Sequence, residues 1–408
     1  MTEKQKWLSR RYLLYRTFSN MWFFGVVWLY FYRLYITDQQ VGLLDGIAFA
    51  VGLVAEVPSG ALADKFGRDR MVRLGQMFIA GGILIQVLGH SFTPFVVGQA
   101  IMMIGFSLVS GADDALFFEK LGFDRGSTQW RKLVTRGSQA ALVATLTANV
   151  IGGWLHTINP RIPWVLTSAG FVAATILIWP IKDTRPRSAR GKFGQEIKSY
   201  LQDVKVGFSQ FRLPKLRPYI PLIITVQGLF YLTGYGLLRV VLLSRFTFSP
   251  LGGAIAVAAC GVITVLLLHF THKYADKLSE KRTLMVVALS AAAALLLAVP
   301  HIGTWGFAVI LLLYAGEYVL YTFMSEILNN HASEEHRATV LSGASFLRML
   351  PYVCLAPIIG LLNTKGQLQY FLIIWALLIC VATIQYLLST RRDTKVETVD
   401  LVEVEPVI

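Results

Sequence analysis

The amino-acid sequence predicts an all-α membrane protein whose twelve transmembrane helices form two pseudo-symmetric bundles of six. Three observations support this prediction. The chain has 408 residues, of which 55% are hydrophobic and only 15% are charged, whereas soluble domains carry about 25% charged residues. The apolar residues occur in long runs, and most basic residues fall between alternate runs. A soluble globular protein is therefore excluded, because too few polar side chains remain to cover a surface in water.

The apolar runs have the length of membrane spans. Each has about 18 to 25 residues, enough for an α-helix to cross a hydrocarbon core about 30 Å thick. Lipid offers no hydrogen-bond partners, so each run must satisfy its backbone internally as a helix. We expect helices over residues 13–36, 40–62, 72–91, 94–119, 137–157, 163–181, 218–238, 250–271, 283–300, 303–327, 338–362 and 367–389.

The basic residues set the predicted orientation. With the N-terminus in the cytoplasm, 32 of the 38 Lys and Arg fall in segments on the cytoplasmic side. This is the positive-inside pattern, so both termini are expected in the cytoplasm. The net charge of +14 then reflects topology and does not indicate a nucleic-acid partner. The basic N-terminal stretch leads into the first run without a small-residue cleavage site, so we expect this helix to stay in the membrane.

A basic linker divides the predicted helices into six and six. We expect an N-terminal six-helix bundle over 1–181, a cytoplasmic linker over 182–217, a C-terminal bundle over 218–390 and a cytoplasmic tail over 391–408. Within the linker, apolar residues at near-helical spacing favour an amphipathic helix on the membrane surface; a flexible tether is the alternative. These residues are Ile197, Leu201, Val204 and Phe208.

A short basic motif follows the second run. Between Gly60 and Arg70 the chain reads Gly-Ala-Leu-Ala-Asp-Lys-Phe-Gly-Arg-Asp-Arg, which we interpret as a tight hairpin with a glycine near each end. It closely resembles the loop between the second and third helices of the major facilitator superfamily. The matching residues are Gly60, Leu62, Ala63, Asp64, Lys65, Gly67, Arg68 and Arg70, while Asp69 replaces the usual cation.

A second, degenerate copy of the motif supports a duplicated six-helix unit. A shift of 212 residues places Ala275–Arg282 on Ala63–Arg70, and Glu326 on Asp114. Parallel repeats of this kind are typical of the architecture that the resemblance implies, the major facilitator fold.

Three further segments resemble one branch of this superfamily, the bacterial drug-efflux-like permeases. They are Glu56-Val-Pro-Ser-Gly, Ser110-Gly-Ala-Asp-Asp-Ala-Leu and Arg337-Ala-Thr-Val-Leu-Ser. The resemblance implies a multi-pass protein of the bacterial plasma (inner) membrane, with a small-molecule substrate, protons and the lipid bilayer as partners. We expect a monomer.

The resemblance also implies that the motif is a gate element. Asp64 is then expected near the N-terminus of the helix that begins close to Arg337, and Arg68 is expected to pair with Asp113 or Asp114. The gate residues expected on this basis are Gly60, Asp64, Lys65, Gly67, Arg68, Arg70, Asp113 and Asp114. The alternative is that these charges only fix the topology.

Acidic residues within membrane spans are costly and are often functional. Glu317 and Arg348 lie at similar predicted depth on neighbouring helices, so they could form a pair that either carries protons or only joins the helices. Asp45, with Arg33 as the cation expected to neutralise it, and Glu56 are further candidates for proton coupling, and Glu56 is alternatively a gate residue.

Residues at four-residue spacing are candidates to line a substrate cavity, which the resemblance places between the first, fourth, seventh and tenth helices. Ordinary helix packing is the alternative. The candidates are Asn20, Phe24 and Trp28; Gln99, Met103 and Ser107; Gln227, Tyr231 and Tyr235; and Tyr314, Tyr318 and Tyr321 around Glu317.

The favoured function is a secondary transporter that exports amphipathic, drug-like molecules by alternating access in exchange for protons. The antiporter signature Gly-Pro-x-x-Gly-Gly is only partly kept, as Ala148-Asn-Val-Ile-Gly-Gly153, so antiport is less firmly indicated than transport. The alternatives are a proton-coupled importer or exporter of a specific metabolite, and a membrane receptor or scaffold without turnover. No phosphate-binding, metal-binding or nucleophile motif occurs, so we expect neither an enzyme nor a cofactor or metal.

Overall fold

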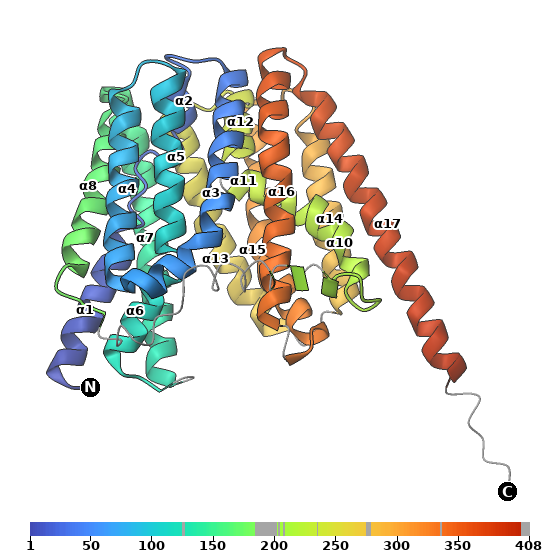
Figure 1. Cartoon of the computed structure of the whole chain (residues 1–408). Helices are drawn as coiled ribbons and strands as arrows, with labels where there is room; N and C mark the ends of the chain where they lie inside the picture. Colours follow the sequence, from blue (N-terminus) through green and yellow to red (C-terminus); the bar gives the residue numbers. More distant parts are fainter. Residues whose placement is uncertain are drawn as a thin grey trace, which may run out of the picture. The chain divides into compact units, whose positions relative to one another are not determined.

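The structure is a computed structural model that describes residues 1–124, 127–183, 202, 205–206, 209–234, 236–274, 279–334 and 337–400. Every regular element in these ranges is helical (Figure 1). The elements are α1 (Glu3–Phe18), α2 (Trp28–Tyr32), α3 (Asp38–Phe66), α4 (Arg68–Leu88), α5 (Phe92–Val109), α6 (Ala112–Leu121), α7 (Thr128–Ile158), α8 (Ile162–Ile178), η2 (Arg217–Tyr219), α10 (Ile220–Leu222), η3 (Ile223–Gln227), α11 (Gly228–Gly234), α12 (Leu237–Arg245), α13 (Pro250–Tyr274), α14 (Glu280–Leu297), η5 (Gly303–Trp305), α15 (Gly306–His331), α16 (Arg337–Thr364) and α17 (Leu368–Asp400).

The helices confirm an all-α membrane protein. Within the described residues, eight helical segments are long and apolar enough to cross a membrane. The other predicted spans correspond to α1 with α2, to α8, to the bent pair α11 and α12, and to α14. Together they are consistent with the twelve helices that the sequence predicts.

Contacts divide the chain into two compact units. Unit 1 comprises Met1–Gln202, Thr247–Ala259 and Leu355–Thr364, and unit 2 comprises Asp203–Phe246, Cys260–Cys354 and Lys365–Ile408. Two short segments that follow the linker in sequence therefore pack with unit 1. The predicted domain limits stay predictions, and most of the predicted linker helix lies outside the described residues, as do the first four residues of the Ala275–Arg282 repeat.

In unit 1, α3, α4, α5 and α8 run side by side (Figure 1). Glycines allow α4 and α5 to approach with their backbones nearly in contact. A methyl group on Gly82 would lie 2.4 Å from the carbonyl oxygen of Gly98, and one on Gly105 would lie 2.6 Å from that of Gly75. Small residues at such crossings are typical of helices packed in lipid, where burial of apolar surface gives no driving force.

The prediction that the first membrane helix is continuous is wrong. Residues 13–36 are not one span, because α1 ends at Phe18 and a series of turns leads to α2. Asn20 Nδ2 donates to the carbonyl oxygen of Arg16 at 2.8 Å, which satisfies the end of α1. The turns then pack so closely on α7 that a methyl group on Gly152 would lie 1.6 Å from the carbonyl oxygen of Phe23.

The motif after Gly60 is more helical than predicted. Helix α3 continues to Phe66, so Gly60 lies inside the helix and not in a turn. The reversal into α4 depends on Gly67 alone, whose φ of 99° is accessible to glycine and strained for other residues. This single glycine places α3 and α4 antiparallel to each other.

Candidate functional site

Unit 2 contains a broken transmembrane helix. The segments Arg217–Gly234 and Leu237–Arg245 are bent by 70° relative to each other. Gly236, with φ 118°, precedes α12, and a π-helical turn at Ile223–Gln227 precedes α11. Irregular backbone at membrane depth is tolerated only where protein or a cavity satisfies it, so such breaks are typical of transport sites.

Glu317 of α15 lies directly against this break. A methyl group on Gly234 would come within 2.0 Å of Glu317 Oε1. The carboxylate therefore occupies the space that the missing side chain leaves at the end of α11. The close approach, and not the backbone conformation, favours glycine at this position, since Gly234 has no unusual φ and the contact is with the tip of a flexible side chain.

Two arginines line cavities that Glu317 also lines. Arg348 of α16 lines with it a cavity of about 180 Å³, together with Gln227, Phe230, Tyr231, Leu320 and Tyr321. Arg239, in the first turn of α12, lines with it a smaller neighbouring cavity. The guanidinium of Arg348 lies 5.1 Å from the ring centre of Tyr321 and 5.9 Å from that of Tyr231. Glu317 and Arg348 thus border the same cavity, whereas no direct ion pair joins them among the contacts of the described residues; Arg239 adds a cation that we did not predict.

The aromatic candidates around this site lie in different environments. Gln227, Tyr231 and Tyr314 are buried. Tyr318 and Tyr321 are exposed, and Tyr314 and Tyr318 contact each other with ring centres 5.2 Å apart. Tyr235 lies outside the described residues.

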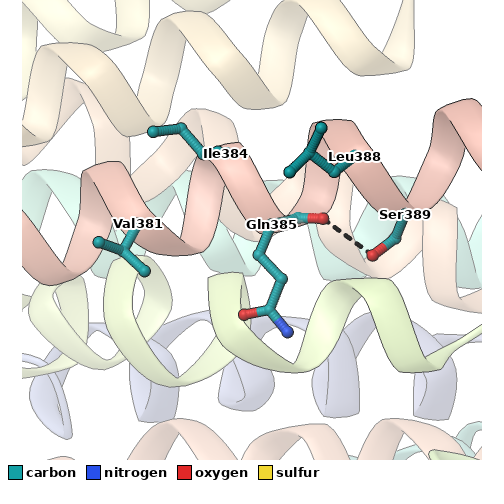
Figure 2. A pocket seen from close by; sticks show the side chains of 5 residues that line it. All are labelled: Val381, Ile384, Gln385, Leu388 and Ser389. Carbon is teal, nitrogen blue, oxygen red and sulfur yellow. Dashed lines mark hydrogen bonds between the residues drawn. The ribbon is translucent and has the colours of Figure 1, made fainter.

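A larger hollow on α17 has no comparable chemistry. Figure 2 shows the five side chains that line this groove of about 430 Å³, all of them from one helix. The Ser389 hydroxyl donates to the backbone carbonyl of Gln385 at 2.8 Å, and Val381, Ile384 and Leu388 are exposed. An exposed apolar helix face without charge is the expected surface toward lipid, so we do not regard it as a substrate site.

In unit 1 the first group of cavity candidates does not share a helical face, which corrects that expectation. Asn20 lies in the turns after α1, where its own carbonyl oxygen accepts from Thr145 Oγ1. Phe24 stacks on Trp164 with ring centres 4.0 Å apart, and Trp28 is buried beside Tyr32. Phe24 and Trp28 thus contribute to packing within the unit.

The candidates on α5 pack against α3. The Ser107 hydroxyl donates to the carbonyl oxygen of Gly52 at 3.1 Å, and Met103 lies in contact distance of the same glycine. Gln99 is buried one turn before Met103. These contacts favour the packing alternative for Met103 and Ser107.

The other embedded acids also lie in unit 1. Asp45 is buried within α3. Arg33, the cation expected near Asp45, donates two hydrogen bonds of 2.7 and 2.8 Å to the carboxylate of Asp38. Ser110 donates to Glu56 Oε1 at 3.5 Å, near the end of α5.

Arg68 of the motif after Gly60 has a different partner from the predicted one. Arg68 Nη1 lies 3.6 Å from Glu119 Oε2 on α6, whereas we expected Asp113 or Asp114. Glu119 lies about one and a half turns further along α6 than the two aspartates, and its side chain is longer by one methylene. The carboxylate of Asp183 accepts from the Arg68 backbone N–H at 3.0 Å and thereby caps α4. Asp69, the residue that departs from the superfamily pattern, pairs with Arg73 one turn later.

Asp113 and Asp114 instead bind tyrosines of α1. Both acids lie in the first turn of α6, where the helix N-terminus favours negative charge. Tyr12 donates to Asp114 Oδ1 at 2.9 Å, and Tyr15 donates to Asp113 Oδ2 at 3.1 Å. Gln76 of α4 donates to the Tyr15 hydroxyl at 2.8 Å. The network ties α1, α4 and α6 together at the motif end of unit 1.

The opposite end of α3 is held by a segment of α16. A methyl group on Gly360 would lie 2.3 Å from the carbonyl oxygen of Asp38, and one on Gly42 would lie 2.3 Å from that of Ala356. Asn363 Nδ2 donates to the Asp38 carboxylate that Arg33 also binds. This crossing belongs to unit 1 and lies remote from the gate motif.

A sequence profile of the Major Facilitator Superfamily matches residues 13–354. The match includes the motif after Gly60 and the residues around Glu317. The chain belongs to the Major Facilitator Superfamily. The transporter is therefore a multi-pass membrane protein that handles a small molecule, and it is not an enzyme. Among the described residues no group of three His, Cys, Asp or Glu is arranged to hold a metal ion.

Two curated relatives are bacterial. An uncharacterized MFS-type transporter, YxaM of Bacillus subtilis, is 21% identical over 403 residues, which cover 92% of this chain and 95% of that protein. The quinolone resistance protein NorA of Staphylococcus aureus is 23% identical over 288 residues, which cover 69% of this chain and 70% of that protein.

Solved transporter structures share the fold. A peptide transporter POT aligns with a TM-score of 0.75 and 12% identity over 95% of this chain and 94% of that chain. The nucleoside transporter NupG aligns with a TM-score of 0.72 and 12% identity over 95% of this chain and all of that chain, 100%. At this level of identity the likeness shows the fold alone.

Proposed function

We propose that the transporter exports amphipathic small molecules by alternating access, driven by the proton gradient, with Glu317 as the proton-binding acid. The observation that carries this proposal is the position of Glu317 against the broken helix at Gly234. An acid held at a backbone break inside a membrane unit is costly to retain without a function. A receptor or scaffold without turnover gives no reason for it.

The walls of the cavity beside Glu317 support an amphipathic substrate. Phe230, Tyr231, Leu320 and Tyr321 supply apolar and aromatic surface, while Gln227 and Arg348 supply polar groups. Mostly apolar pockets with a few polar groups that converge are typical of small-molecule sites.

Two observations support the direction of transport and the cellular location of the protein. The similarity to a protein named for quinolone resistance favours export, and the bacterial relatives favour a bacterial plasma membrane. The positive-inside pattern supports a cytoplasmic location for both termini, and we propose a monomer. A carrier of one specific metabolite is the second candidate, because fixed cations such as Arg239 and Arg348 select for a defined charge.

We further propose that the motif after Gly60 acts as the cytoplasmic gate. Arg68 and Glu119 both expose about a quarter of their side chains, 28% each, so their pair is weak enough to break and re-form. The contact of Asp64 with the N-terminus of α16 stays a prediction. The crossing at Gly42 and Gly360 is the corresponding point of closure at the outer end.

Purified protein in liposomes with an imposed pH gradient tests this proposal. A panel of amphipathic dyes and drugs is added with the gradient in either direction, and accumulation is followed over time. Accumulation that reverses with the gradient supports proton coupling and gives the direction. Accumulation indifferent to the gradient contradicts proton coupling, and a panel that is not transported at all contradicts the amphipathic substrate.

A further inference from the structure

The site around Glu317 has more positive than negative charge. Two guanidinium groups, those of Arg239 and Arg348, share cavities with a single carboxylate. The Nε atoms of both arginines are buried and have no hydrogen-bond partner within the described part of the chain. A buried donor without a partner costs free energy that a bound acceptor recovers.

The two arginines lie in different cavities. Glu317 borders both, whereas Arg239 borders only the smaller and Arg348 only the larger. Arg239 thus faces Glu317 from the smaller cavity, away from the space open to a ligand of the larger one. Arg348 faces the larger cavity with an incomplete set of acceptors, and a guanidinium has five N–H donors to satisfy.

The surroundings of Arg348 also limit the shape of its ligand. Its guanidinium lies over the rings of Tyr321 and Tyr231, and Phe230 and Leu320 complete an apolar wall. The cavity of about 180 Å³ is smaller than the roughly 300–1,000 Å³ typical of drug-sized ligands. A compact ligand with a flat apolar body and an acidic group fits both the size and the chemistry.

We propose that the substrate is a compact aromatic organic anion whose acidic group binds Arg348. This inference rests on the proposed function, because it takes the cavity beside Glu317 to be the transport site. Arg348 supplies parallel N–H donors to the anionic oxygens, a geometry that a guanidinium forms better than an ammonium group. Tyr231 and Tyr321 then flank the aromatic body.

Three probes with one naphthalene ring and different charge test this inference. They are 1-naphthalenesulfonate as the anion, 1-naphthalenesulfonamide as the neutral form and 1-naphthylmethylammonium as the cation. A ligand that binds only the folded protein raises its unfolding temperature, so binding is measured by thermal unfolding of the purified full-length transporter. We expect the sulfonate to raise this temperature and the other two probes to leave it unchanged.

Substitutions at Arg348 assign the effect to this residue. Arg348→Gln is expected to weaken sulfonate binding by about 10- to 100-fold, the range for loss of a hydrogen bond to a charged group. Arg348→Lys keeps the charge and should keep part of the affinity. Arg131→Gln removes an equal charge at an exposed position of unit 1 and should change nothing. If Arg348→Gln does not fold, sulfonate binding by Arg348→Lys and the charge preference of the wild type still test the anion site.

The outcomes separate this inference from the proposed function. Equal binding of the anionic and cationic probes, or sulfonate binding unchanged in Arg348→Gln, overturns the anion site. Proton-dependent uptake of the neutral or cationic probe into liposomes without uptake of the sulfonate overturns the anion site and leaves the transport proposal in place. If none of the probes binds or is taken up while the dye panel is transported, again only the anion site is overturned.

Discussion

The carboxylate of Glu317 fills the space that a side chain on Gly234 would occupy, since a methyl group there would lie 2.0 Å from Glu317 Oε1. The relationship couples an embedded acid to the end of a broken helix. Because the clashing atom is the far end of a flexible side chain, the carboxylate can move without a shift of the backbone.

Gly234→Ala is therefore expected to displace the carboxylate and to leave the fold intact. We expect accumulation of the transported dye to fall by about tenfold, within the range that small displacements of functional groups cause in enzyme sites. Uptake into liposomes and the unfolding temperature measure the two effects. Gly81→Ala is the control, because beyond its chain neighbours and the adjacent backbone of its own helix no heavy atom lies within 4 Å of the added methyl group. An unchanged uptake in Gly234→Ala would show that the position of the carboxylate does not matter.

Glu317→Gln tests the role of the acid itself. An amide cannot take up a proton, so we expect loss of accumulation against a concentration gradient. Exchange of labelled for unlabelled substrate at equilibrium requires no proton movement and should persist. Measuring both in the same liposomes separates coupling from binding. Retained proton-driven accumulation would mean that Glu317 only joins the helices around it.

The ion pair of Arg68 and Glu119 predicts that exchanging the two charges restores transport lost in the single variant. Arg68→Glu alone puts two acids near each other in place of an ion pair whose atoms lie 3.6 Å apart, so transport should slow. Combining it with Glu119→Arg restores opposite charges and should recover part of the rate. The coupling between the two sites is expected to be about 0.2–1 kcal/mol, as for other partly exposed pairs. Strictly additive effects in this double-mutant cycle would reject the pair as a gate contact.

The Tyr15 hydroxyl is expected to stabilise unit 1. Tyr15 is only 1% exposed, donates to Asp113 and accepts from Gln76. Tyr15→Phe leaves both partners short of a hydrogen bond, at a cost of about 1–3 kcal/mol. Thermal unfolding in detergent measures the loss, with Tyr370→Phe at an exposed position of α17 as the matched control. Equal unfolding temperatures for the two variants would contradict the importance of the network.

The crossing of α3 with the end of α16 tolerates no side chain at Gly360. In Gly360→Ala the methyl group meets the carbonyl oxygen of Asp38 at 2.3 Å, and a backbone cannot yield as a side-chain tip does. The helices must separate, at a cost of about 1–3 kcal/mol as in other overpacked sites. We expect a lower unfolding temperature and slower transport, with Gly81→Ala again as the control. A variant as stable as the wild type would show that this crossing is not closely packed in the membrane.

Much of the architecture could be predicted from local sequence. The apolar runs, the positive-inside pattern and the motif after Gly60 predicted an all-α membrane protein of the correct superfamily. The similar predicted depth of Glu317 and Arg348 on adjacent helices suggested that they could pair, and the two residues border one cavity. Each of these inferences depends on spacing along one or two helices, which the period of the α-helix fixes.

The interruptions of the helices were harder to predict. The turns between α1 and α2 lie within the predicted run, which has no proline, and they are held by contacts with other helices: Thr145 donates to the carbonyl oxygen of Asn20, and Phe23 lies close to Gly152. The break before α12 had a local signal, Gly234-Tyr-Gly236 within an apolar run, which predicts a helix interruption and would have pointed to Arg239.

The sequence by itself determined the helical membrane class and the superfamily, because hydrophobic length and local motifs act residue by residue. Only the tertiary structure decided the partners: Glu119 for Arg68, tyrosines for Asp113 and Asp114, and two arginines around Glu317. Pairing depends on side-chain reach and on backbone approach at glycines, and neither is encoded in the spacing along one helix.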